Sequence, residues 1–198
     1  MKGLIMKTGV FLTLILLFGC TLAQVKVEVL SERTAMENQI LGTYNSLDRE
    51  MLLLASVRSV DSSGKIRPPQ KKSREHQDAV SALQIQAFHA DDLQNFKRLK
   101  WVGENKDGLL TPFPMSQEGI PEELKSFAGR YTKEEFESVV SQLNAAREII
   151  MQRVVSMNEK IRDSDYQKIR EIFGKLNTEN ALPGERIQHE DGRWTVKP

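Results

Sequence analysis

Apolar residues recur three and four positions apart along several stretches of this chain, which is the spacing of one face of an α-helix. The spacing predicts long helices over 34–60, 73–99 and 132–161, and a short one from about 164 to 174. We expect their apolar stripes to form the core. The stripes consist of Ile40, Leu41, Tyr44, Leu47, Met51, Leu54 and Ala55; Val80, Leu83, Ala87, Phe88, Leu93, Phe96 and Leu99; Phe136, Val140, Leu143, Ile150, Val154, Met157 and Ile161; and Ile169, Ile172 and Phe173.

Helix starts are marked by hydroxyl residues followed three positions later by a Glu or Gln. Thr34 with Glu37 and Thr132 with Glu135 have the form of capping boxes, and the stretch 164–167 is expected to cap the last helix. The stretch 61–72 contains small polar residues, two prolines and a basic pair, so it is predicted to be a loop.

A few segments show the period of two that is typical of strands. Val25, Val27 and Val29 alternate with charged residues, which fits either a short strand or an extended tether. The stretch 185–196 alternates around Asp191-Gly192, a strong hairpin signal. The predicted fold is therefore mainly α, with long amphipathic helices and a small β element.

The middle of the chain, 100–129, is rich in proline and glycine. Proline at this density excludes a long helix, and irregular segments on a rigid scaffold often carry recognition. We therefore expect a functional loop in this region.

A short pattern occurs twice. Gly103-Glu104 is followed by Asp107-Gly108, and Gly184-Glu185 is followed by Asp191-Gly192. We call these the two Gly-Glu units. They are either unrelated turns or strand–turn units that lie side by side between the long helices.

The N-terminus has the layout of a secretory signal peptide. Lys2 and Lys7 precede an almost wholly apolar stretch at 8–18, and Cys20, the only cysteine, follows Gly19. The uncharged run is short and partly polar for a transmembrane helix, which needs about 20 apolar residues. A cysteine at this place resembles a bacterial lipoprotein signal, with residues 1–19 removed and Cys20 lipidated. A plain signal peptide with an incidental cysteine is the alternative.

Lipidation would make the rest of the chain a domain tethered to a membrane. Each buried methylene contributes about 0.8 kcal/mol, so two or three palmitate-like chains give a lasting anchor. Thr21 stands where an Asp would favour inner-membrane retention in many lipoproteins, so we expect an outer-membrane protein that faces the periplasm. The predicted organisation is a signal peptide (1–19), a lipidated tether or short strand (20–33), a helical pair (34–99) and a region with the irregular loop, the long helix and the hairpin (100–198).

Composition excludes some functions. The chain has 28 basic and 27 acidic residues, so it lacks the excess of positive charge that a nucleic-acid partner requires. A single cysteine leaves no disulfide within the chain.

The sequence contains no recognisable catalytic or metal motif. His76, His89 and His189 do not have the spacing of a helical zinc site, and no Gly-x-Ser-x-Gly or phosphate-binding loop is present. The paired acids Asp91-Asp92 and Glu134-Glu135 are interpreted as helix-dipole or surface residues. We expect no cofactor, no metal and no enzymatic activity.

The enzymatic alternative is a hydrolase in which Glu104 and Glu185 form a carboxylate pair. We favour a structural role, in which each carboxylate accepts backbone amides at the start of its turn. The two tryptophans are interpreted as core residues in preference to recognition residues. The candidate partner-binding residues are Trp101, Gly103, Glu104, Gly184, Glu185 and Trp194.

The region 101–197 resembles the YdbL-like family of periplasmic proteins of unknown function. The resemblance rests on the two Gly-Glu units, on a Leu-Asn-Ala-Ala-Arg helix segment between them, and on the closing Asp-Gly-Arg-Trp. The matching stretches are Val102–Glu104, Asp107–Leu109, Leu143–Arg147, Leu182–Glu185 and Asp191–Trp194. The lipidation-type Cys20 and the added front half, 31–99, depart from the small members of that family.

The resemblance implies an accessory factor of the cell envelope, since some members of the family are linked to phospholipid transport between membranes and help a lipoprotein to assemble with a large bridge protein. The expected partners are a membrane, through the lipid anchor, and another envelope protein. A lipid-binding carrier or sensor that holds phospholipid and a self-associating structural spacer are the alternatives.

Overall fold

The computed structural model describes residues 35–56, 73–159 and 161–198. The chain divides into two compact units, Met1–Asn38 and Gln39–Pro198. The first contributes only the start of one helix to the described residues. The signal segment, Cys20, the strand or tether at 24–30, the cap at Thr34 and the loop at 61–72 lie outside the described residues.

The predicted fold class is confirmed, because the described residues are mostly helical and carry one small sheet. The helices are α3 (Ala35–Ser56), α4 (Arg74–Phe88), α5 (Ala90–Arg98), α6 (Glu122–Ala128), α7 (Lys133–Ser156) and α8 (Tyr166–Asn180), with a 3₁₀ turn, η1 (Asp163–Asp165), before the last. The strands are β1 (Val102–Glu104), β2 (Leu110–Pro112), β3 (Arg186–Gln188) and β4 (Trp194–Val196).

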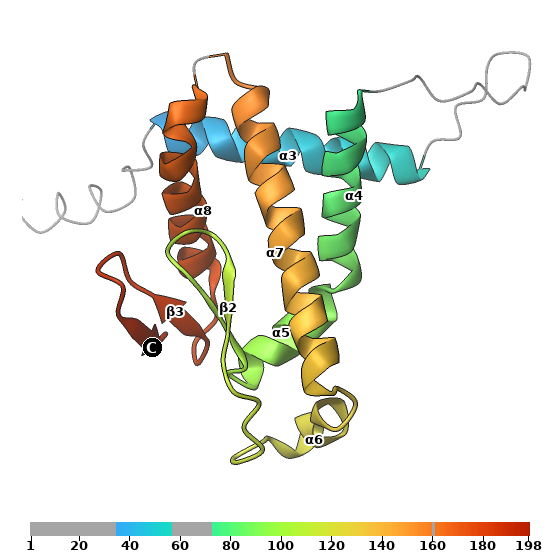
Figure 1. Cartoon of the computed structure of the whole chain (residues 1–198), viewed down its shortest axis with the longest axis vertical. Helices are drawn as coiled ribbons and strands as arrows, with labels where there is room; N and C mark the ends of the chain where they lie inside the picture. Colours follow the sequence, from blue (N-terminus) through green and yellow to red (C-terminus); the bar gives the residue numbers. More distant parts are fainter. Residues whose placement is uncertain (1–34, 57–72, 160) are drawn as a thin grey trace, which may run out of the picture. The chain divides into compact units, whose positions relative to one another are not determined.

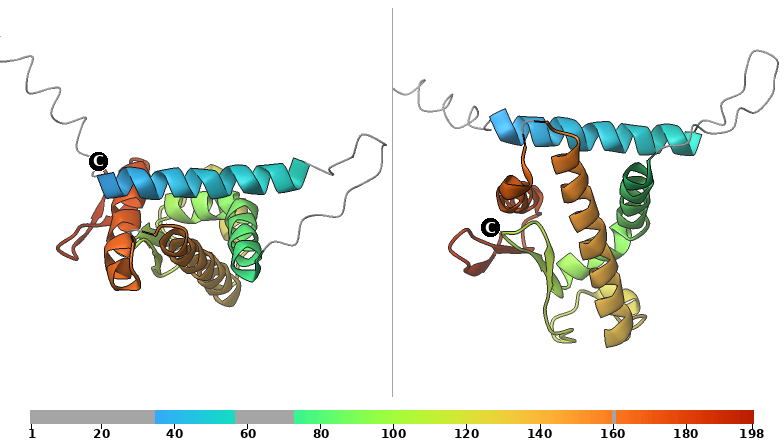
Figure 2. Two further views of the ribbon diagram at one scale, coloured as in Figure 1. Left: turned by 90° about the horizontal axis from the view of Figure 1, so that it is seen from above. Right: turned by 45° about the horizontal axis from the view of Figure 1, so that its top comes forward.

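The long helix α7 lies between α4 and α8 (Figures 1 and 2). It carries buried side chains along its whole length. Phe136 in its first half packs into a core with Phe96 of α5, Trp101 just before β1 and Phe127 of α6. α4 packs directly on α7.

From Gln39 onward, α3 runs across the ends of α4, α7 and α8 (Figure 2). Leu47 of α3 is fully buried against Leu83 of α4 and Ile150 of α7. Asn158, just after α7, exchanges side-chain hydrogen bonds with Gln39 and Thr43. The front helix is therefore part of the same core as the back half.

The prediction of one helix over 73–99 is wrong. Ser73 caps its start, but α4 ends at Phe88, the following His89 has a ψ of 13°, and α5 begins on the next residue. The break changes the direction of the apolar stripe, so Phe88, which was predicted to lie in the core, is 80% exposed. After the break, Phe96 and Leu99 are buried as predicted.

The ends of the last two helices also differ from the predictions. The capping box at Thr132 and Glu135 is confirmed, but α7 stops at Ser156 instead of 161. The last helix has no side-chain cap, because η1 leads directly into it, and it continues past Gly174 to Asn180. Gly174 does not end the helix; it provides space for another segment, as described below.

The four strands form one sheet in the order β2-β1-β3-β4. The hairpin predicted around Asp191-Gly192 is confirmed as β3 and β4, with Gly192 at a positive φ of 87°. The irregular middle contains β1, β2 and the short helix α6, which starts directly after Pro121. The region thus contains no long helix among its described residues, as predicted, but it does contain this short one.

Candidate functional site

The two Gly-Glu units lie side by side, as the second interpretation predicted. β1 and β3 pair in parallel, with Gly103 opposite Arg186 and Glu104 opposite Ile187. Each strand then turns back into its own antiparallel partner, β2 or β4. Residues 83 positions apart in the chain are thus neighbours in the middle of one sheet. Just after β1, Lys106 N–H also donates to Gln188 Oε1.

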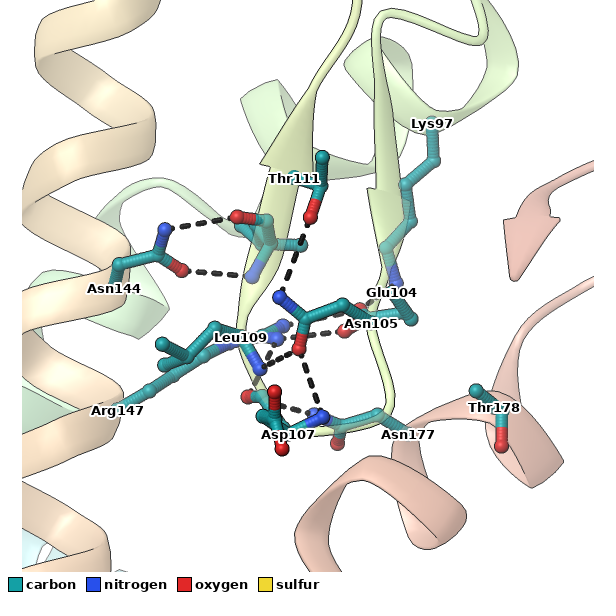
Figure 3. A network of polar contacts seen from close by, with 12 residues as sticks. Lys97, Glu104, Asn105, Asp107, Leu109, Thr111, Asn144, Arg147, Asn177 and Thr178 are labelled. Carbon is teal, nitrogen blue, oxygen red and sulfur yellow. Dashed lines mark hydrogen bonds and ion pairs between the residues drawn. The ribbon is translucent and has the colours of Figure 1, made fainter. Parts of the chain in front are cut away.

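Glu104 points from β1 into the interior, and only 1% of the residue is exposed. Arg147 of α7 binds its carboxylate at two points, with distances of 2.6 Å from Nη1 to Oε2 and 3.0 Å from Nη2 to Oε1 (Figure 3). Lys97 Nζ of α5 lies 2.6 Å from Oε1. A two-point contact of this kind fixes both position and orientation of the carboxylate.

Glu185 is also buried, with 3% exposure, but its contacts are weaker. Its carboxylate accepts hydrogen bonds from Gln94 Nε2 at 3.1 Å and from Leu182 N–H at 3.0 Å. Lys97 Nζ lies 3.8 Å from Oε2. Lys97 therefore stands between the two glutamates, and Lys97, Glu104, Arg147 and Glu185 form what we call the four-charge cluster, with two positive and two negative groups.

The charges of the cluster decide the protonation of Glu104. Burial alone would raise the pKa of its carboxyl, but the adjacent Arg147 and Lys97 outweigh burial and lower the pKa to about 2. Glu104 is therefore ionised at neutral pH. A general acid or base works best when its pKa lies near the working pH, so this carboxylate is poorly suited to proton transfer.

The predicted role of the glutamates is right for one and wrong for the other. Glu185 accepts a backbone amide, that of Leu182, at the start of its turn. Glu104 binds side chains instead. The reason is that β1 is a central strand, whose backbone pairs with β2 and β3 while its glutamate faces α5 and α7.

The cation partners of the cluster were not among the predicted site residues. Asn144 and Arg147 are three positions apart on a helix, a spacing that places both on one side, facing the β1–β2 hairpin. This spacing is the feature of the sequence that could have identified Arg147 as a partner of the hairpin. Lys97 gave no distinct signal, because a lysine in the last turn of a helix is ordinary.

Asn144 and Asn105 hold the first hairpin in shape (Figure 3). Asn144 Oδ1 accepts the Leu110 N–H at 2.8 Å, and its Nδ2 donates to the Leu110 carbonyl at 2.9 Å. Asn105 Oδ1 accepts the N–H groups of Asp107 and Leu109 at 3.0 and 2.9 Å. Side-chain amides thus supply the bonds that so short a hairpin cannot make alone.

The tip of this hairpin docks onto α8. The Gly108 carbonyl accepts hydrogen bonds from Arg147 Nη1 at 3.1 Å and Asn177 Nδ2 at 3.3 Å. Lys106 lies so close to Gly174 that a Cβ on that glycine would be 2.0 Å from the Lys106 carbonyl oxygen. Glycine is therefore required in the middle of α8 for backbone-to-backbone contact.

Most of the candidate partner-binding residues are buried. Trp101 is 0% exposed, and its indole N–H donates to the Ser116 carbonyl at 3.1 Å, so its predicted core role is confirmed. Gly103, Glu104 and Glu185 are buried as well, which corrects the expectation that they could contact a partner at the surface. Their burial follows from their position between the helices and the sheet.

Gly184 and Trp194 lie at the surface, so the interpretation of Trp194 as a core residue is wrong. Gly184 is exposed and has a positive φ of 90°. Trp194 is half-buried, and its ring lies over Gly103, where an added Cβ would be 2.5 Å from Cζ3. Gly103 therefore makes room for Trp194 on the outer face of the sheet.

A cavity of about 180 Å³ lies between α3, α4, α7 and α8. Its lining mixes apolar residues with polar ones such as Tyr44, Gln86 and Arg147. Ligand pockets usually measure roughly 300–1,000 Å³, so this cavity is too small to enclose a phospholipid.

Two further findings bear on chemistry. Within residues 35–56, 73–159 and 161–198, no group of three or more His, Cys, Asp or Glu side chains is placed to hold a metal ion. Among the helices of that same part of the chain, none is both long and apolar enough to cross a bilayer.

Comparison with protein-family models, with curated proteins and with solved structures finds no match to this chain.

Proposed function

We propose that this chain is a membrane-anchored lipoprotein of the cell envelope that acts as an accessory or assembly factor for other envelope proteins, without enzymatic activity. The anchor is supported by Cys20, which follows a basic start and a short apolar run. The absence of a polybasic excess and of a catalytic motif in the sequence is consistent with a binding role.

The proposal depends on the observation that the carboxylates of the four-charge cluster find all their partners inside the fold. Each carboxylate oxygen of Glu104 and Glu185 has a hydrogen-bond or ion-pair partner inside the fold. An acid–base pair for hydrolysis would need at least one carboxyl with access to substrate, whereas both carboxylates are buried and engaged inside the fold. The cluster instead fastens the sheet to α5 and α7, so the surface is left as the place for function.

The proposed relation to the YdbL-like family gains support from the location of the shared residues. The Gly-Glu units, Arg147 and Trp194 are far apart in the chain and gather around one sheet. If the chain and the family share a fold, we expect them to share the residues that build this sheet. By this resemblance, the partner belongs to a system for lipid transport between membranes, although a fold alone does not fix a function.

A second candidate function is lipid binding in the cavity beneath α3. The mixed lining favours a molecule with one polar end, and the volume of about 180 Å³ limits it to the end of a single chain. Mass spectrometry of gently purified protein would reveal a co-purifying lipid; purified protein free of lipid would remove this candidate.

The proposed function is tested by labelling cells with radioactive palmitate and by crosslinking in intact membranes. Wild-type protein should incorporate label, fractionate with membranes and be captured with another envelope protein. Cys20→Ser should lose the label and leave the membrane fraction, while Thr21→Ser, the matched control, should behave as wild type. Wild-type protein that takes up no palmitate and crosslinks to no partner would refute the proposal.

A further inference from the structure

The two outer edges of the sheet differ. On β2, Thr111 pairs with Gly103 and the flanking bonds run from Phe113 to Trp101 and from Asn105 to Leu109, so the backbone of Leu110 and Pro112 faces outward. Asn144 occupies both polar groups of Leu110, and Pro112 has no N–H. This edge is sealed against another strand.

The opposite edge, on β4, is open. Hydrogen bonds join His189 N–H to Arg193, and Lys197 N–H to Glu185, so the odd-numbered residues of β4 face β3. The N–H and C=O groups of Trp194 and Val196 therefore point away from the sheet. Within the part of the chain that the structure describes, nothing bonds to them. Unpaired strand edges of this kind are templates for an added strand.

The side chains along the open edge form two different faces. On the outer face, Val196 is 47% exposed, and Trp194 packs at right angles on Phe113 with ring centroids 5.0 Å apart. Arg186 lies over the same Phe113 ring, 4.3 Å from its centroid, and no carboxylate of a described residue pairs with it. Trp and Arg are the residues most enriched at binding hot spots.

The other face carries the side chains of two basic residues, Arg193 and Lys197. Arg193 is strongly exposed and pairs only with Asp191, two residues away. Lys197 extends along the end of α8, where its Nζ donates to the carbonyls of Thr178 and Glu179. An added strand would place its alternate side chains against an apolar face and a basic face in turn.

The charged side chains along β4 also indicate which kind of strand could pair with this edge. A second copy that paired antiparallel through β4, centred on Thr195, would place Arg193 directly opposite Lys197 of the other chain. Like charges opposite one another destabilise a strand pair, whereas acidic side chains at those places would stabilise it. In this register the edge disfavours its own copy, and acidic side chains opposite Arg193 and Lys197 are favoured.

We propose that the open edge of β4 binds an extended segment of another protein whose side chains alternate between apolar and acidic. The segment adds a fifth strand, its apolar residues pack beside Trp194 and Val196, and its acidic residues face Arg193 and Lys197. This inference rests on the proposed function, since it identifies the surface and the chemistry through which the accessory factor would hold its partner.

The edge can be tested with the purified full chain and two synthetic peptides, one of alternating valine and glutamate and one of alternating valine and lysine. Binding is measured by the anisotropy of a dye on the peptide. The glutamate peptide should bind at least about tenfold more tightly than the lysine peptide. Arg193→Glu should reverse or abolish that preference. Equal binding of both peptides, or none, would overturn the inference.

Val196→Pro tests the backbone contact. It removes only an outward N–H, and proline is tolerated at such an edge position, so the fold should persist. The matched reference is Val196→Thr, which also loses the valine side chain but keeps the N–H. Val196→Pro should bind the glutamate peptide about tenfold or more weakly than Val196→Thr does. Unchanged binding by Val196→Pro, with native circular dichroism, would overturn the inference, as would a β4-dependent dimer in sedimentation.

Crosslinking in membranes separates this inference from the proposed function. If wild type and Val196→Pro both capture an envelope partner equally, the accessory role stands and the β4 inference fails. If wild type captures no partner although the glutamate peptide binds specifically, the accessory role fails and the β4 inference stands.

Discussion

The two Gly-Glu units begin with the same residues and pair with each other, yet their surroundings differ. Glu104 is held by two cations, and the turn that follows it docks on α8. Glu185 is held by an amide, a backbone N–H and a more distant lysine, and its hairpin reaches into solvent at Gly192. The difference separates two tasks: the first unit anchors the sheet to the helices, and the second presents an open edge.

The largest expected effect is at Arg147. Arg147→Met should lower the free energy of unfolding by about 3–5 kcal/mol, because it leaves the buried Glu104 carboxylate with only Lys97. Urea denaturation measures the change. The control is Arg98→Met, which breaks an exposed pair with Glu123 and should cost less than about 1 kcal/mol. Equal effects of the two substitutions would show that the cluster does not anchor the sheet.

The docking of the first hairpin is tested at Gly174. Gly174→Ala should destabilise the protein by about 1–3 kcal/mol, since the added methyl group would overlap the Lys106 carbonyl. Gly129→Ala is the matched control, because a Cβ there would meet its nearest atom at 3.6 Å. Thermal denaturation should therefore separate the two variants clearly. A Gly174→Ala protein as stable as wild type would contradict the docked geometry.

Acid should lower the stability that Glu104 of the first Gly-Glu unit contributes to the fold. Because the pKa of Glu104 is lowered from 4.5 to about 2, the folded state binds fewer protons than the unfolded state between these values. The stability that Glu104 contributes is complete above pH 4.5 and is lost as the pH falls toward 2. Between pH 5 and pH 3 the loss should be about 2 kcal/mol.

The control for the acid effect is Glu104→Gln, which cannot titrate at this position. The free energy of unfolding of this variant should change less between pH 5 and pH 3 than that of wild type, by about 2 kcal/mol. Parallel pH profiles of the two proteins would show that Glu104 is not the carboxyl responsible.

The smallest expected effect is at Glu185. Glu185→Gln keeps the shape and an oxygen acceptor, and the ammonium of Lys97 stays paired with Glu104 at 2.6 Å. The cost should be about 1 kcal/mol, well below that of Glu104→Gln. Denaturation of both variants under the same conditions provides the comparison. If Glu185→Gln lowered the free energy of unfolding more than Glu104→Gln, the second Gly-Glu unit would be the one that anchors the sheet to the helices.

The periodic pattern of apolar residues was enough to predict the fold class and the position of most helices, though not their exact ends, and Thr132 with Glu135 was enough to predict the cap of α7. The repeated Gly-Glu and Asp-Gly dipeptides were enough to suggest that two strand–turn units are neighbours. Both patterns involve residues close together in the sequence or a motif that repeats, so both can be recognised without knowing the tertiary fold. The break at His89 could not be predicted, because neither proline nor glycine marks it.

The charge partners of the site were harder to predict. Glu104 meets Lys97 and Arg147 only because α5, β1 and α7 pack together, and pairing at such distances is set by the tertiary fold. Gly174 shows the same difficulty: read locally, it predicts a helix end, whereas its purpose is a close contact with Lys106. The difference between the sheet edges likewise depends on Asn144, which is 34 positions from Leu110.

We propose that the four-charge cluster is structural and that the function lies at the surface of a membrane-anchored accessory protein. The most direct test is the double variant Glu104→Met with Arg147→Leu, which replaces the buried ion pair by apolar side chains and leaves Lys97 with Glu185. We predict a protein more stable than either single variant that still crosslinks to its envelope partner in membranes as wild type does. A double variant that folds normally and loses its partner would contradict the claim.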